Sequence, residues 1–277
     1  MVDVIRDQVP MPTELRVLSW NIDGLDCELD EDDLLGRALW VIKTIHEERP
    51  HVVFLQELIE FNYHVISSML ESKYHIFRQE LPSAPYFVGI LVHRASADVI
   101  GKAVTIPFPT SKMGRDGLAV NVKLKGSDMT FRCITAHLES LRESSSERVR
   151  QLELCDAHIE KRKEGLTATI IGGDLNIRDS EVPAAWRSRD CWSLAGSPPE
   201  AEYTWDLARN DNARMPNGGK PRCRFDRMYL LPHAKGKQVT VREFHLTGLT
   251  RVEGLGRFAS DHFGIFTTFS LSSPHSN

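Results

Sequence analysis

Short apolar segments that each end in a polar residue recur along the chain. Their length, their β-branched and aromatic content and the turn-forming residues near them predict buried strands. We expect four such strands, at residues 15–20 before Asn21, 52–56 before Glu57, 129–137 ending at His137, and 168–173 before Asp174. Because buried strands make a stiff scaffold, the polar residues at their ends are expected to converge on one rim of the fold.

The rest of the pattern predicts further strands with a few helices between them. Helical apolar spacing covers residues 34–45, behind an acidic first turn, and a second helix is expected around 61–71. Ser144 and Glu147 predict a capping box that opens a third helix, which runs to about Lys163 and stops at Gly165. Further strands are expected near 74–79, 86–93, 117–124, 224–230, 238–246 and 262–270. This succession, without a repeat or a long linker, predicts one domain with an α/β fold of two packed sheets flanked by helices.

Composition narrows the class of protein. The 277 residues are 41% hydrophobic and 26% charged, as in ordinary soluble domains, and no apolar run is long enough to cross a membrane. The first twelve residues, MVDVIRDQVPMP, do not resemble a secretory signal. Five cysteines without a CxxC pair favour reduced thiols over a disulfide framework or a zinc site.

Charge is informative through its distribution. The formal net charge is -4, so the chain has no global positive field for nucleic acid. Residues 26–33 are strongly acidic, and a basic cluster surrounds Phe225 and Asp226. Its members are Arg214, Lys220, Arg222, Arg224 and Arg227. Such runs are usually solvated faces, so this cluster matters only if the residues around it carry chemistry.

The sequence GGDLN at 172–176 is the sharpest chemical signal. Two glycines at a strand end allow a tight turn and a close ligand approach. Asp174 and Asn176 project to one side if the chain stays extended, and a carboxylate beside an amide can aim a water at phosphorus. An Asp/Asn turn that satisfies its own backbone is an equally good reading of this segment.

Two further segments contribute acidic and imidazole groups. Asp261 and His262, in SDH, can serve a metal and a phosphoryl oxygen separately, although this tripeptide alone is a weak signal. Asp226 lies among apolar residues and needs a partner, either a histidine N–H or one of the neighbouring Arg224 and Arg227.

Other polar strand ends have both a functional and a structural reading. Glu57 suits a hard cation or the N-terminus of the next helix, and Asn21 can orient phosphate or form a turn. His137 and Ser140, in HLES, can donate to phosphate oxygens or lead into the next helix. Trp205 and Phe225 can stack on bases, although aromatic residues more often pack in a core.

The ordered set WNIDGL, LQE, HLES, GGDLNIRD, YTWD, RFDR and SDH resembles the endonuclease/exonuclease/phosphatase superfamily. Within it the set is most similar to the catalytic domains of the 5′-tyrosyl-DNA phosphodiesterases. The resemblance spans residues 14–271 and leaves 1–13 and 272–277 as terminal tails. It implies a four-layer αββα sandwich with Mg²⁺, for which Mn²⁺ could substitute, in a cleft at one rim.

The resemblance also implies roles for individual residues. Glu57 would be a metal ligand, with Asp261 and Asn21 in or next to its shell. Asp174 would activate water with the help of Asn176, and His262, oriented by Asp226, would stabilise phosphoryl oxygens. His137, Ser140 and Arg115 would contact the substrate phosphate or its groove, Trp205, Phe225 and Met215 would line the DNA groove, and Arg178 would belong to a narrow basic track with Lys220, Arg222 and Arg224.

The implied reaction is hydrolysis of a 5′-phosphotyrosyl bond between DNA and a topoisomerase II-derived tyrosine or peptide, leaving a 5′-phosphate. A tyrosine phenolate, with a pKa near 10, leaves without full protonation, which lessens the need for a general acid. A single-stranded DNA end as partner, a monomer without a membrane and residence in the nucleus, or also in the cytoplasm, follow as expectations. The alternatives are an abasic-site nuclease, an RNA deadenylase, a lipid phosphatase or an inert binding module.

Overall fold

The computed structural model describes residues 12–26, 30–80 and 84–272. Within these ranges the strands form two six-stranded sheets and one two-stranded ribbon. The first sheet has the order β13-β14-β1-β2-β4-β3. Its strands are β1 (Glu14–Asn21), β2 (Val52–Leu58), β3 (Tyr74–Arg78), β4 (Phe87–His93), β13 (Gln238–Thr247) and β14 (Gly264–Ser272). β1 and β2 are parallel, so both point their carboxyl ends toward the same rim.

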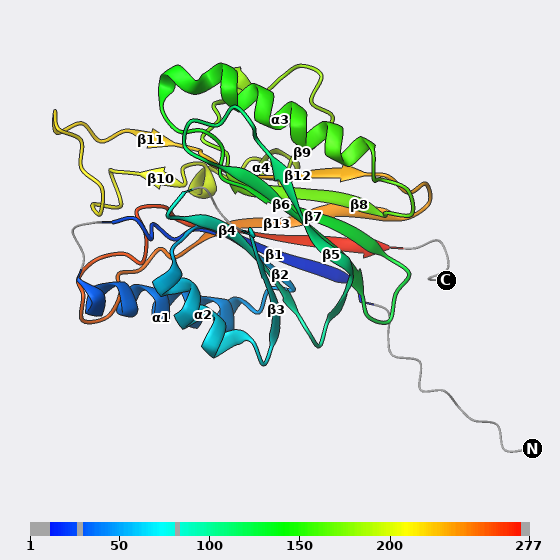
Figure 1. The fold of residues 1–277 in the computed structure, drawn as a ribbon, viewed down its shortest axis with the longest axis horizontal. Helices are drawn as coiled ribbons and strands as arrows, with labels where there is room; N and C mark the ends of the chain where they lie inside the picture. Colours follow the sequence, from blue (N-terminus) through cyan, green and yellow to red (C-terminus); the bar gives the residue numbers. More distant parts are fainter. Residues whose placement is uncertain (1–11, 27–29, 81–83, 273–277) are drawn as a thin grey trace, which may run out of the picture.

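The second sheet has the order β5-β6-β7-β8-β12-β9. Its strands are β5 (Ala97–Pro107), β6 (Asp116–Leu124), β7 (Thr130–Ala136), β8 (Ala168–Asp174), β9 (Arg189–Asp190) and β12 (Asp226–Pro232). β7 and β8 are also parallel, whereas β12 runs antiparallel to β8 and therefore begins where β8 ends. The ribbon of β10 (Trp205–Asp206) and β11 (Arg222–Cys223) projects beside this rim, at the left of Figure 1.

Helices cover the outer faces of the two sheets (Figure 1). α1 (Glu31–Glu48) and α2 (Glu60–Leu70) lie on the first sheet, and α3 (Ser145–Glu160) lies on the second. Shorter turns of helix are α4 (Cys191–Leu194), η1 (Arg142–Ser144), η2 (Asp179–Glu181) and η3 (Pro199–Ala201). Within the described ranges, no helix combines the length and the apolar character that crossing a bilayer requires.

Three apolar clusters hold the layers together. One lies between the sheets, where Phe54 of β2 and Phe131 of β7 are fully buried. A second joins the first sheet to α1 and α2, and a third joins the second sheet to α3. This order of helix, sheet, sheet and helix confirms the four-layer αββα sandwich expected from the sequence.

The short strands β9, β10 and β11 were not predicted from the sequence, and the structure differs from the sequence expectations at two further places. β5 was not predicted, because this edge strand of the second sheet leaves most of its side chains exposed or half-buried and so shows no apolar pattern. The predicted capping box is wrong: Ser144 makes no side-chain cap, and the carboxylate of Glu147 instead accepts a hydrogen bond from Thr110, while α3 ends at Glu160. The described cysteines are free thiols, and Cys27 lies outside the described residues.

Candidate active site

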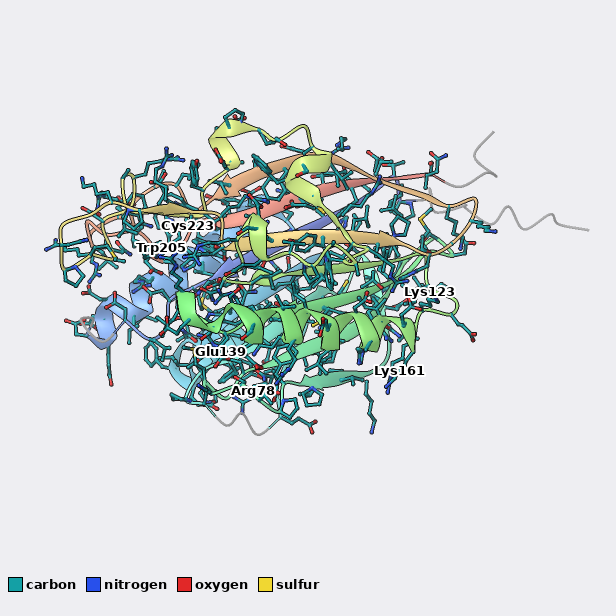
Figure 2. All side chains as sticks on the ribbon, turned by 90° about the horizontal axis from the view of Figure 1, so that it is seen from above. Arg78, Lys123, Glu139, Lys161, Trp205 and Cys223 are labelled. Carbon is teal, nitrogen blue, oxygen red and sulfur yellow. The ribbon has the colours of Figure 1, made fainter. Side chains whose placement is uncertain are left out.

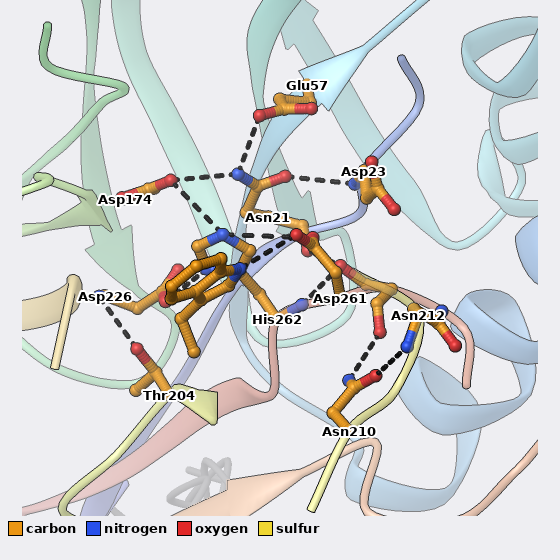
Figure 3. A network of polar contacts seen from close by, with 12 residues as sticks. Asn21, Asp23, Glu57, Asp174, Thr204, Asn210, Asn212, Asp226, Asp261 and His262 are labelled. Carbon is orange, nitrogen blue, oxygen red and sulfur yellow. Dashed lines mark hydrogen bonds and ion pairs between the residues drawn. The ribbon is translucent and has the colours of Figure 1, made fainter. Parts of the chain in front are cut away.

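Polar side chains from both sheets meet at the rim where the parallel strands end (Figure 3). Asn21 and Glu57 stand at or near the ends of β1 and β2, and Asp174 ends β8. Asp226 begins β12 and pairs in register with Asp174, and His262 lies just before β14. The fold thus brings together five residues from separate segments of the sequence.

Asp174 lies at the centre of this group. Its Oδ2 accepts a hydrogen bond from Asn21 Nδ2 at 2.9 Å and lies 3.3 Å from His137 Nε2 and 3.7 Å from His262 Nε2. Burial alone would raise the pKa of Asp174, but the two imidazoles and the Asn21 amide hold it well below the ordinary value. The carboxyl group is therefore ionised at neutral pH and acts only as a hydrogen-bond acceptor.

The two glycines before Asp174 are required by packing. A Cβ on Gly173 would lie 2.0 Å from the carbonyl oxygen of Ala136, and one on Gly172 would lie 2.9 Å from the Phe54 ring. The turn reading also holds, because Asp174 Oδ1 accepts from the backbone N–H of Asn176 at 3.1 Å. The same carboxylate therefore fixes its own loop and faces the site with its other oxygen.

Asp226 and His262 form a buried pair. His262 Nδ1 lies 2.7 Å from Asp226 Oδ2, and the backbone N–H of Asp226 donates to Thr204 Oγ1 at 3.0 Å. Burial lowers the pKa of His262, but the carboxylates of Asp226, Asp261 and Asp174 together raise it well above the ordinary value. His262 is thus held as a cation with Nδ1 committed to Asp226 and Nε2 directed toward Asp174.

Arg224 and Arg227 are not the partners of Asp226. Arg227 is buried and its Nη1 lies 2.7 Å from Asp179, while Arg224 lies between Asp179 and Asp190. Arg222 in turn lies 2.9 Å from Asp206. Ion pairs therefore neutralise Arg222 and Arg224 of the predicted basic track. Its other two members, Arg178 and Lys220, are exposed and pair with no buried carboxylate among the described residues, and the same holds for Arg214 nearby.

The carboxylates near Asn21 have the character of a cation site. Asn21 Nδ2 donates to Glu57 Oε1 at 3.0 Å, and ligand atoms of Glu57, His137 and Asp174 all lie within 4.8 Å of one another. Glu57 has a left-handed backbone (φ 54°), a strained conformation for glutamate that is found mainly at functional sites. Asp261, half-buried, accepts from Trp205 Nε1 at 2.9 Å.

Asp23 belongs to the same group, although the sequence analysis did not single it out. Burial raises the pKa of its carboxyl group well above the ordinary value, and the nearby Asp261 and Glu57 raise it further, against the lowering effect of Arg37. Three neighbouring carboxylates that repel one another fit a divalent cation with oxygen ligands. The residues present can therefore hold a divalent metal.

Arg37 of α1 ties two loops of the site together and was also missed. Its Nε donates to the carbonyl of Ala259 at 2.7 Å, and its Nη2 donates to Asp23 Oδ2 at 2.9 Å. The Oγ of Ser260 donates to the carbonyl of Asn21 at 2.6 Å. These bonds fix the segment that carries Asp261 against the end of β1. Arg37 has the spacing of an ordinary helix residue, so no local sequence signal separates it from its neighbours.

The predicted phosphate contacts lie beside Asp174. Arg115 is buried, and its Nη1 donates to Ser140 Oγ at 2.8 Å and to the carbonyl of Leu138. Its Nε donates to the hydroxyl of Tyr86 at 3.0 Å, and its guanidinium lies over the Tyr86 ring at 5.4 Å. The Tyr86 ring is 6.0 Å from that of His137. Arg115 therefore orients Ser140. Tyr86, which the sequence analysis did not single out, lies next to the site through its contacts with Arg115 and His137. Asn176 donates through Nδ2 to the carbonyl of Leu138 at 3.1 Å.

The predicted groove aromatics flank the other side of the site. The rings of Trp205 and Phe225 lie 5.7 Å apart at an angle of 36°, and both side chains are half-buried. Figure 2 shows Trp205 beside Cys223 at the ribbon end of the molecule. Met215 is 39% exposed on the loop that joins the two strands of this ribbon. An open aromatic surface next to the polar pocket suits a ligand with planar groups.

Known proteins resemble this chain over most of its length. It is 35% identical to tyrosyl-DNA phosphodiesterase 2 of Gallus gallus over 94% of the chain and 68% of that protein, and 32% identical to the Homo sapiens protein over 92% and 68%. The chain thus spans about two thirds of the length of these relatives.

Solved structures agree with these relatives. A crystal structure of D. rerio TDP2 complexed with single-strand DNA product matches with a TM-score of 0.83 and 33% identity, over 94% of this chain and all 100% of that one. TDP2 from C. elegans matches with a TM-score of 0.79 and 32% identity, over 93% and 75%. The model of the endonuclease/exonuclease/phosphatase family matches residues 18–262. The chain therefore belongs to the endonuclease/exonuclease/phosphatase family.

Proposed function

We propose that this chain hydrolyses 5′-phosphotyrosyl bonds between DNA ends and topoisomerase II-derived tyrosine, leaving a 5′-phosphate, with Mg²⁺ as its cofactor and Mn²⁺ as a substitute. The observation that carries the proposal is the convergence of Glu57, Asp174 and His262 on one rim, beside the aromatic pair of Trp205 and Phe225. The relatives named tyrosyl-DNA phosphodiesterase 2 support the choice of substrate.

Each residue has a distinct task in the proposed reaction. The ionised carboxylate of Asp174 orients a water for in-line attack and takes up its proton as the new P–O bond forms. The cationic imidazole of His262 donates through Nε2 to a phosphoryl oxygen, and Asp226 holds its ring and its charge. Ser140, held by Arg115, and His137 donate to the other phosphoryl oxygens.

Glu57, Asn21 and Asp261 would hold the metal, with Asp23 beside them. When bound, the ion would supply Lewis-acid polarisation and would neutralise charge that develops on the phosphoryl oxygens and on the leaving phenolate oxygen. The phenolate is a good leaving group at neutral pH, which lessens the need for a general acid. A single-stranded end lies along Trp205, Phe225 and Met215, where its bases stack.

The proposed partner and setting follow from the substrate. With a DNA substrate we expect residence in the nucleus, or also in the cytoplasm, and we expect the chain to act as a monomer. The exposed Arg178, Arg214 and Lys220 are expected to make phosphate contacts, so binding should weaken as salt rises.

The test is a side-by-side assay of three substrates with and without Mg²⁺. A 5′-tyrosyl oligonucleotide should release tyrosine and leave a 5′-phosphate, whereas an abasic duplex and a phosphoinositide should turn over far more slowly. Asp174→Asn protein serves as the matched inactive control. Faster turnover of the abasic duplex or of the lipid would replace the proposed substrate, and inactivity on all three would favour a binding module.

A further inference from the structure

A row of polar side chains crosses the first sheet at the end opposite the candidate active site. The backbone of His51 bonds to those of Arg16 and His93, and Tyr74 pairs in register with His93. Residues directly opposite one another on neighbouring strands point to the same face of a sheet. Two positions further along the strands, that face carries residues of the apolar cluster beneath the helices: Leu18, Val53, Leu91 and Ile76. The row therefore lies on the helix-covered face, level with the place where α1 ends.

Arg16, Tyr74 and His93 of this row form one wall of a pocket of about 500 Å³. The other walls come from the last turn of α1 and from the residue before β3. The charged or titratable side chains that line it are Arg16, His46, Arg49, Lys73, Tyr74 and His93. Among the described residues that line the pocket there is no carboxylate. We call this cavity the basic pocket.

The positive charges of the basic pocket are poorly compensated. Within the described part of the chain, neither Arg49 nor Lys73 forms an ion pair. The ion-pair partner of Arg16 is Glu14, at 3.5 Å, and Glu14 is shared with Arg242, which approaches it to 2.8 Å. A second carboxylate, Glu48, also interacts with Arg16, since a hydrogen bond from His245 and the charges of His245 and Arg16 together lower its pKa. A concave surface lined by one sign of charge attracts counter-ions.

The pKa of His93, the histidine of the row that lines the pocket, reflects these positive charges. Burial lowers the pKa of His93, and the nearby cations Arg16 and Lys73 lower it further. The C-terminal end of α1 offers a simpler explanation for cations here, because a helix end carries the equivalent of about half a negative charge. Arg16 is paired with Glu14, so the half charge of the helix end stands against the two full charges on Arg49 and Lys73, and an excess of positive charge remains.

We propose that the basic pocket binds a phosphate-bearing anion with at least two negative charges. Two guanidinium groups can each bind phosphate oxygens through paired N–H donors, and the ammonium of Lys73 adds a point charge. Arg16 precedes Asn21 by five strand residues, which places the pocket about 17 Å from the end of β1. A ligand in the basic pocket therefore leaves the candidate active site free.

The experiment measures thermal stability with pyrophosphate against sodium chloride of equal ionic strength. The test variant is Arg49→Asn with Lys73→Ser, because position 49 has a left-handed backbone (φ 50°) that asparagine tolerates. The control is Lys102→Ser with Lys123→Ser, two exposed lysines of the second sheet that remove the same charge (Lys123 is labelled in Figure 2). At about 100 times the dissociation constant, the melting temperature of the wild type and of the control should rise by about 5 °C or more.

The test variant should lose most of that rise while it keeps its turnover of the 5′-tyrosyl substrate. A second titration with an unmodified DNA duplex distinguishes the source of the phosphate. If the test variant loses the rise in melting temperature with pyrophosphate but not with the duplex, the ligand of the basic pocket is a small polyphosphate. If it loses the rise with both, the ligand is a nucleic-acid backbone. Equal rises in all three proteins, or no rise beyond that in sodium chloride, would overturn the proposal.

Discussion

Replacing Asp226 by asparagine tests whether this residue acts through His262. The two side chains are almost entirely buried. Within the described residues, Asp226 Oδ2 has one side-chain hydrogen-bond partner, His262 Nδ1, at 2.7 Å. Asparagine can still accept from His262 Nδ1 through its amide oxygen, so the ring keeps its place. The negative charge that favours the cationic imidazole is lost, and the pKa of His262 should fall.

The size of the effect follows from the environment. Asp226 Oδ1 makes no hydrogen bond within the described residues, and the neighbouring Thr204 Oγ1 already accepts from the Asp226 backbone N–H, so the new NH₂ group would be poorly satisfied. An unsatisfied buried donor costs about 1–3 kcal/mol of the free energy of unfolding. Loss of one charged donor to the phosphoryl oxygens lowers turnover by about 10²–10³, which corresponds to about 2.7–4 kcal/mol of the activation free energy.

A double-mutant cycle separates the two effects. Single-turnover rates on 5′-tyrosyl DNA are measured for Asp226→Asn, His262→Gln and the double variant, with Asp190→Asn as a control carboxylate that pairs with Arg224 instead. If Asp226 acts through His262, the double variant is no slower than His262→Gln alone, because effects on one unit are not additive. Rate losses that multiply, or equal losses in the Asp190 control, would refute this reasoning.

Four further outcomes are expected. Asp174→Asn should lower turnover by about 10²–10⁴ while DNA binding in a filter assay is largely kept. EDTA should abolish turnover and Mg²⁺ should restore it; turnover that survives EDTA would exclude a metal at Glu57. Arg37→Lys, which cannot reach both Ala259 and Asp23, should raise the Mg²⁺ concentration needed for half-maximal stabilisation in calorimetry. Burial and Arg16 lower the pKa of His51 to about 4, so the unfolded chain binds more protons than the folded chain below pH 6.5. The free energy of unfolding should therefore decrease as the pH is lowered from 6.5 to 4, by up to about 3 kcal/mol. His51→Asn should flatten this pH dependence in urea titrations.

The sequence was sufficient for the layers of the fold and for the residues that meet at the rim. A strand such as β1 or β8 shows its burial in its own composition, and parallel pairing then fixes which end its polar residue occupies. Asn21, Glu57 and Asp174 could be selected for that reason, since each stands at or beside a buried strand end. Their roles in catalysis stay predictions that the variants above address.

Residues whose partners are distant in the chain could not be found in this way. Arg37 binds the carbonyl of Ala259, which is 222 positions away, and Tyr86, just before β4, contacts Arg115, which lies 29 positions further along the chain, just before β6. Neither pairing leaves a local pattern. Local patterns also misled, as with Ser144 and Glu147, whose capping-box spacing was overridden when Glu147 bonded to Thr110.

Charge shows most clearly why sequence order is an uncertain guide to electrostatics. The basic run around Phe225 is conspicuous in the sequence, yet Arg224 and Arg227 are neutralised by acidic residues that precede them by more than thirty positions. No basic run in the sequence joins Arg16 of β1, Arg49 just after α1 and Lys73 just before β3. The register of the first sheet and the end of α1 nevertheless bring these three residues to one cavity. Strand register decides which charges become neighbours, and compensation by carboxylates decides which of them still attract a ligand. A candidate anion site can therefore lie where the sequence carries no basic cluster.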